Sequence, residues 1–135
     1  MEKETLKRIF EFLEEKEEHK APFIWKLENN IPLTEEELNV KGDLDLRFSS
    51  ITSLPEGLEV GDDLYLHYSK ITSLPDDLQV GGELNIIGCD AITSLPKGLE
   101  VGKILYIKYT PLTKYSDEEL REMIKPGFIK GEIVR

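Results

Sequence analysis

The chain has 135 residues, one cysteine and a formal net charge of −10, from 17 basic and 27 acidic side chains. This length fits about one domain, and a single cysteine excludes an internal disulfide framework. The acidic balance argues against direct binding to nucleic acid or to an anionic membrane, because both require basic groups. No apolar run approaches the ~20 residues of a transmembrane helix, and the acidic amino terminus is unlike a signal peptide, so we expect a cytoplasmic protein.

Residues 1–30 predict an amino-terminal helical cap. Residues 5–18 predict an amphipathic helix, because four apolar residues fall at helical spacing: Leu6, Ile9, Phe10 and Leu13. The charged run that follows predicts a solvated helix face, and Pro22 ends the helix. Apolar residues return at 23–25, and Asn29 and Ile31 fall in the frame of the repeats described next. We therefore predict a degenerate first coil there, with Trp25 in the core of the cap.

A sequence repeat occupies the middle of the chain. Ile-Thr-Ser-Leu-Pro occurs at residues 51–55, 71–75 and 92–96. Each copy is followed at fixed offsets by Leu, Val and Gly, and then by an alternating apolar pair: Leu64/Leu66, Leu84/Ile86 and Leu105/Ile107. Alternation of period two predicts a short strand with one buried face. Because one such unit is too small to form a core alone, the copies must stack, which predicts a solenoid over residues 31–115.

The repeat resembles the leucine-rich repeat, L-x-L-x-x-N-x-L-x-x-L-P, and is most similar to its short 20-residue bacterial kind, also seen in small proteins of large phages. Residues 64–75, LYLHYSKITSLP, are one copy. The family's Asn position holds small polar groups that can hydrogen-bond the corner backbone: Ser49, Ser69, Cys89 and Thr110. The resemblance implies an α/β repeat solenoid with one parallel sheet on its concave face, which such repeats generally use to bind proteins. One extra residue near 88–91 predicts a bulge.

Residues 116–135 predict a carboxy-terminal cap. Ser116 and Glu119 form the pattern of a capping box, and a buried helical stripe follows: Leu120, Met123 and Ile124. Apolar pairs at 128–129 and 133–134 predict an extended segment that pairs with the last coil and covers its open edge. Residues 1–135 are thus predicted to be a single domain, with the caps 1–30 and 116–135 on either side of the repeats 31–115.

The sequence predicts no catalytic or metal site. A catalytic Cys89 would need a neighbouring base and electropositive surroundings, and its place in the repeat favours a structural role. His67 and His19 have no ligand partners at metal spacing. The acidic pairs at 62–63 and 76–77 lack the Gly/Asp nonapeptides of calcium-binding repeats. No nucleophile, base and orienting group fall on one face, so we expect no enzyme activity and no cofactor.

The outward positions of the predicted strands form the candidate binding face. Exposed aromatic residues in a row are typical of interfaces, although they could merely cover a small sheet. The outward positions also include Ile104. Beside them lies a row of one residue per coil, at positions 48, 68, 88 and 109. The candidate partner-binding residues are Asp43, Asp45, Arg47, Phe48, Asp63, Tyr65, His67, Tyr68, Glu83, Asn85, Ile87, Tyr106, Lys108 and Tyr109.

Two functions remain open at this point. The first is a non-enzymatic protein-interaction module, monomeric by default, whose partner has a basic surface. The alternative is a small acidic inhibitor of a nucleic-acid-handling protein, of the phage anti-defence type. The acidic residues are spread along the chain, which favours the first. The predicted strands offer only ~200 Å² in projection, against ~800 Å² per partner in a standard interface, so a partner must also contact a cap or a flank.

Overall fold

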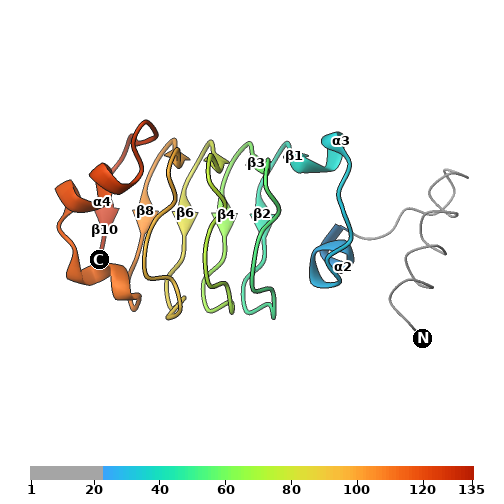
Figure 1. Ribbon diagram of the computed structural model, residues 1–135, viewed down its shortest axis with the longest axis horizontal. Coiled ribbons are helices and arrows are strands. Elements are labelled where there is room, and N and C mark those ends of the chain that lie inside the picture. Colours follow the sequence, from blue (N-terminus) through green and yellow to red (C-terminus); the bar gives the residue numbers. More distant parts are fainter. Residues whose placement is uncertain (1–22) are drawn as a thin grey trace, which may run out of the picture.

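The computed structural model describes residues 23–135, so the helix predicted over 5–18 and its end at Pro22 lie outside the described residues. The described chain winds into a parallel β-solenoid, whose coils stack side by side between short terminal helices (Figure 1). Each coil contributes one short strand to each of two sheets. The first sheet contains β2 (Leu44–Asp45), β4 (Leu64–Tyr65), β6 (Leu84–Asn85), β8 (Leu105–Tyr106) and β10 (Ile133–Val134).

The predicted repeat frame is confirmed by the register of this first sheet. Leu44 aligns with Leu64, Leu64 with Leu84, and Leu84 with Leu105, so each coil of the structure is one copy of the sequence repeat. Leu105 aligns with Ile133, which makes the last coil longer than those before it. All pairs are parallel, because each strand is followed by a complete turn of the solenoid before the next one begins.

A second sheet is present that the sequence analysis did not predict. It contains β1 (Asn39–Val40), β3 (Glu59–Val60), β5 (Gln79–Val80), β7 (Glu100–Val101) and β9 (Phe128–Ile129). The valines at positions 60, 80 and 101 face the core, while residue 59 or 79 before them faces out. Strands this short do not show the alternation that identifies a strand in a sequence. The stacking of equivalent segments in register nevertheless pairs their backbones.

The core is a set of columns in which equivalent residues of successive coils contact one another. The inward strand positions are fully buried at Leu66 and Ile86, and so are the repeat isoleucines Ile71 and Ile92. The corner glycines allow this close stacking. A Cβ atom added at Gly81 would lie 2.1 Å from the carbonyl oxygen of Gly61, a distance that no side chain tolerates. Gly102, which follows Val101, has the same 2.1 Å approach to the carbonyl oxygen of Gly81, so the spacing of the coils requires glycine at both positions.

The amino-terminal end is helical, as predicted for the cap 1–30, but one segment of it differs from the prediction. The segment predicted to be a degenerate first coil contains the helix α2 (Phe23–Glu28). Phe23 and Leu27 lie one helical turn apart, so a helix presents both to the core. A second helix, α3 (Glu35–Leu38), has a capping box formed by Thr34 and Glu37. Glu37 also binds Lys26 of α2, with 3.0 Å between Lys26 Nζ and Glu37 Oε1, which joins the two helices.

The carboxy-terminal prediction is confirmed. The long last coil contains the 3-10 helix η1 (Pro111–Lys114) and the helix α4 (Asp117–Met123), which begins with the predicted capping box of Ser116 and Glu119. The strands β9 and β10 extend the two sheets by pairing with β7 and β8. Arg121 of α4 donates hydrogen bonds to the carbonyl oxygens of Ile129 and Gly131, so two acceptors beside β9 are occupied by the chain itself.

The extra residue of the third coil forms a turn, not a strand bulge. Residues 90 and 91 are exposed and lie in a turn that is closed by a hydrogen bond from Ile92 N to Cys89 O. This turn lies outside both sheets. The additional residue therefore changes neither the register of β6 with β8 nor that of β5 with β7.

Candidate interaction face

The predicted strand alternation places the candidate residues on one surface, the outer face of β2, β4, β6 and β8. The inward neighbours Leu66 and Ile86 are fully buried, whereas the outward positions in between are exposed or half-buried. Together with the row at positions 48, 68, 88 and 109, these outward positions form what we call the interaction face. The structure thus brings together all the partner-binding residues that the sequence analysis selected, from successive coils.

The acidic residues at the amino-terminal ends of these strands hold the coils together. The carboxylate of Asp43 accepts a hydrogen bond from Asp63 N at 2.9 Å, and that of Asp63 accepts one from Glu83 N at 2.7 Å. The same column positions two tyrosines, because Tyr65 Oη donates to Asp63 and Tyr106 Oη donates to Glu83. This column is therefore structural as well as charged, a role that the sequence analysis did not assign to it.

These carboxylates also affect the titration of the two tyrosines. The hydrogen bond to Asp63, together with burial, raises the pKa of Tyr65. Burial and the Glu83 carboxylate raise the pKa of Tyr106. Both phenols therefore remain protonated at neutral pH and act as hydrogen-bond donors.

Two further outward side chains cap the backbone of their own strands. Asp45 Oδ1 accepts a hydrogen bond from Arg47 N, and Asn85 Oδ1 accepts one from Ile87 N. Asp45 also forms a salt bridge with the Arg47 guanidinium, with 2.8 Å between Arg47 Nη2 and Asp45 Oδ2. The hydrogen bonds from the guanidinium hold the pKa of Asp45 below its usual value, although burial opposes this. Several polar groups of the face thus already have partners within the chain.

The row beside the strands has an unusual backbone. Phe48, Tyr68 and Tyr109 have φ angles of 56°, 57° and 60°, in the left-handed region, and Gly88 at the equivalent position has a φ of 74°. The three aromatic side chains are 72%, 50% and 64% exposed. The Phe48 and Tyr68 rings are stacked, with 5.6 Å between centroids and 3° between planes. We refer to Phe48, Tyr68 and Tyr109 as the aromatic row.

Gly88 makes room for the ring of the preceding coil. A Cβ atom at this position would lie 2.4 Å from two ring carbons of Tyr68, so the Tyr68 ring lies directly over the Gly88 backbone. Tyr109, on the far side of Gly88, has the Lys108 ammonium 5.1 Å from its ring centroid. The row therefore consists of a stacked pair and a third ring that is paired with a cation.

Cys89 and Thr110 take the places in the corner that the repeat pattern predicts. Cys89 is fully buried, and its thiol donates a hydrogen bond to Leu66 O over 3.1 Å. Burial raises the pKa of this thiol. Thr110 Oγ1 donates to Ile107 O at 2.6 Å and accepts from Leu112 N. Within residues 23–135, no three His, Cys, Asp or Glu side chains lie close enough together to hold a metal ion.

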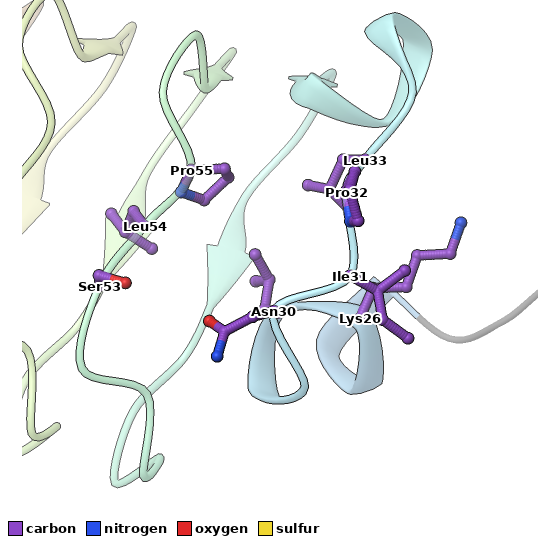
Figure 2. A pocket seen from close by; sticks show the side chains of 9 residues that line it. Lys26, Asn30, Ile31, Pro32, Leu33, Ser53, Leu54 and Pro55 are labelled. Atoms are coloured by element: carbon purple, nitrogen blue, oxygen red, sulfur yellow. The ribbon is translucent and has the colours of Figure 1, made fainter. Parts of the chain in front are cut away.

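An apolar notch lies beside the first coil and is not apparent from the sequence. Figure 2 shows Ile31, Pro32 and Leu33 on one side of it and Ser53, Leu54 and Pro55 on the other. The notch has a volume of about 210 Å³ and lies between the end of α2 and the first Ser-Leu-Pro segment. Residues 31–33 do form an apolar cluster in the sequence, but the repeat frame predicts that they are part of a coil.

Among the described helices, none combines the length and the apolar composition that crossing a bilayer requires. Comparisons with protein-family models, with curated proteins and with solved structures found no match to this chain.

Proposed function

We propose that this protein is a non-enzymatic interaction module of the leucine-rich-repeat type, and that it binds a partner protein through the interaction face. The observation that carries the proposal is the backbone of the aromatic row. An L-amino acid in the left-handed region costs roughly 1–2 kcal/mol, and for bulky residues this conformation is a genuine outlier. Such outliers concentrate at functional sites.

Stability alone does not explain the aromatic row. Glycine adopts a φ near +60° without strain, and Gly88 occupies the equivalent corner of the third coil. Phe48 and Tyr109 combine the strained backbone with a ring that is mostly in water. Two unfavourable features at the same position support a role in binding, where exposed aromatic side chains provide large contact areas.

The acidic-inhibitor hypothesis remains the second candidate, and the net charge of −10 favours it. Electrostatic attraction toward a basic groove would accelerate the association of such an inhibitor. The hydrogen bonds that Asp63 and Glu83 already make within the sheet support the first candidate instead.

The two candidates predict opposite rankings of variants. A partner captured from host lysate on the immobilised protein would be purified, and its Kd measured against the wild type and each variant. For an interaction module, we expect Tyr65→Ala, Tyr106→Ala and Tyr109→Gly each to weaken binding by ~2 kcal/mol or more, as aromatic anchors do. Phe128→Ala is the matched control, because Phe128 is 41% exposed but lies on the second sheet.

Asp43→Asn and Glu83→Gln remove the rim charges but keep an oxygen that can accept the same hydrogen bonds, so they should slow association, and this effect should disappear at high salt. For an acidic inhibitor, pooled reversals of Asp and Glu would abolish binding while the tyrosine variants bind normally. That second pattern would overturn the proposal.

A further inference from the structure

His67 lies at the centre of the aromatic part of the interaction face. Its ring contacts three other rings edge-on, with centroid distances of 6.0 Å to Phe48, 6.1 Å to Tyr65 and 6.4 Å to Tyr68. Phe48 and Tyr68 are the stacked pair of the aromatic row. The imidazole therefore supports both members of the stack from the side, and any movement of it would remove that support.

The imidazole is held in surroundings that favour its neutral form. Its Nδ1 atom is buried and has no hydrogen-bond partner among the described residues. A neutral imidazole can leave the lone pair of Nδ1 unpaired at modest cost. A protonated ring would instead bury a charged N–H donor without an acceptor, which is far more costly.

The charged groups near His67 come from the preceding coil. They are Asp45 and Arg47, and the Asp45 carboxylate is already bound by the guanidinium, with 2.9 Å between Arg47 Nε and Asp45 Oδ1. Burial lowers the pKa of His67, the positive charge of Arg47 lowers it further, and Asp45 opposes these effects.

The groups from the coil of His67 itself and from the following coil do not offset this lowering of the His67 pKa. On the strand of His67 itself, the Tyr65 hydroxyl donates to Asp63 over 3.0 Å. On the following coil, the neighbours are the uncharged Asn85 and Ile87, and the Asn85 carbonyl oxygen is occupied by Ile87 N. Within the described part of the chain, each carboxylate near the imidazole therefore already has a partner.

We propose that protonation of His67 in mild acid separates the stacked Phe48 and Tyr68 rings, so that the interaction face has an assembled neutral form and an open acidic form. The charged ring must find an acceptor for its new Nδ1–H, and it can do so only by leaving the three rings. The consequence for binding, loss of the partner in mild acid, rests on the proposed function. The rearrangement of the rings does not.

The rearrangement can be tested on the isolated protein by NMR between pH 8 and pH 5. We expect the nuclear Overhauser contacts between the Phe48 and Tyr68 rings to disappear with the same midpoint as the titration of the His67 ring. In His67→Phe, which keeps a ring beside the stack but cannot be protonated, these contacts should persist at every pH. In His19→Gln, which changes the other histidine, the transition should remain. Contacts that persist in the wild type below the His67 midpoint would overturn the proposal.

Two charge variants test whether the surroundings of His67 set the midpoint. Arg47→Gln removes the repelling cation and frees Asp45, so the midpoint should rise. Asp45→Asn removes the attracting carboxylate, so the midpoint should fall. Both side chains are about half exposed, with 50% and 47% of their surfaces accessible, so neither change threatens the fold. A ring separation whose midpoint is the same in all three proteins would show that a group other than His67 drives it, which would overturn the proposal.

Binding of the captured partner separates this proposal from the proposed function. We expect the affinity of the wild type to fall tenfold per pH unit below the His67 midpoint, as linkage to one proton requires, and that of His67→Phe to stay level. If the rings separate but the affinity does not change, the binding role of this face is wrong and the switch stands. If the rings stay stacked, the switch is wrong whatever the affinity does.

Discussion

The corner after each strand of the first sheet contains two residues with separate tasks. The first adopts the left-handed conformation and is an aromatic residue or Gly88. The second is a small polar residue, which is buried at Ser69, Cys89 and Thr110. The resemblance to leucine-rich repeats predicted the second position correctly for Cys89 and Thr110. Ser49 departs from it, because its buried hydroxyl has no partner among the described residues. Cys89 binds the carbonyl oxygen of Leu66, which lies in the preceding coil. The segment that precedes the coil of Ser49 is the helix α2, so Ser49 has no such corner carbonyl beside it.

This structural role of Cys89 predicts an unreactive thiol. Because the side chain is fully buried and burial raises its pKa, iodoacetamide should label it only after the protein unfolds. Mass spectrometry in buffer and in denaturing urea would measure the difference. Cys89→Ser should cost less than ~1.5 kcal/mol, since the hydroxyl can make the same hydrogen bond to Leu66 O. Rapid labelling of the native protein would show that the corner is open.

At the scale of elements, the sequence predicted the strands that contain an alternating apolar pair and the carboxy-terminal cap, and it missed α2 and the second sheet. The alternating pairs identified β2, β4, β6 and β8, because several copies repeat the same pattern. The helix α2 and the notch beside it come from a single segment, 23–33, whose apolar residues fit a coil as well as a helix. The strands of the second sheet were missed because they are too short to carry periodicity. The left-handed φ of Phe48 and Tyr109 was also invisible, since no aromatic residue favours that conformation.

The link between α2 and α3 should weaken in acid. Burial alone would raise the pKa of Glu37, but the hydrogen bonds from Thr34 N and Lys26 Nζ hold it below its usual value. A carboxyl whose pKa is lower in the folded state stabilises that state above its unfolded pKa, and the contribution is lost as the pH falls through the folded value.

We therefore expect the backbone amides of α3 to lose protection from hydrogen exchange as the pH falls below ~4.3, the usual pKa of Glu. Glu37→Gln should show this loss of protection already at pH 7. Glu119→Gln is the matched control, because Glu119 closes the other capping box. Full protection of α3 in Glu37→Gln at pH 7 would mean that the Lys26 pair contributes nothing.

At the scale of the whole molecule, each coil contacts only its neighbours. The array nevertheless has too few coils for its ends to stay folded when a middle coil unfolds. Leu84 is fully buried and aligns with Leu64 on one side and Leu105 on the other. We expect Leu84→Ala to lower the free energy of unfolding by about 2–5 kcal/mol, as other buried leucine truncations do. Unfolding in urea should remain a single transition by circular dichroism and by Trp25 fluorescence.

Separate transitions for the two probes would show that the ends unfold independently of the middle. Glu59→Ala, on the exposed side of the second sheet, is the control and should change the unfolding free energy by less than ~0.5 kcal/mol.

The turn at residues 90 and 91 shows that one corner of the solenoid can change length while both sheets keep their register. A peptide inserted at this corner should therefore leave the pairing of both sheets unchanged. A short peptide epitope or a fluorescent label placed between Asp90 and Ala91 would report on the third coil while leaving the interaction face intact. Insertions and deletions that arise by mutation should be tolerated at this corner. They should be selected against within the neighbouring strands, where adding or removing one residue would move the inward side chains of the strand to its outer face.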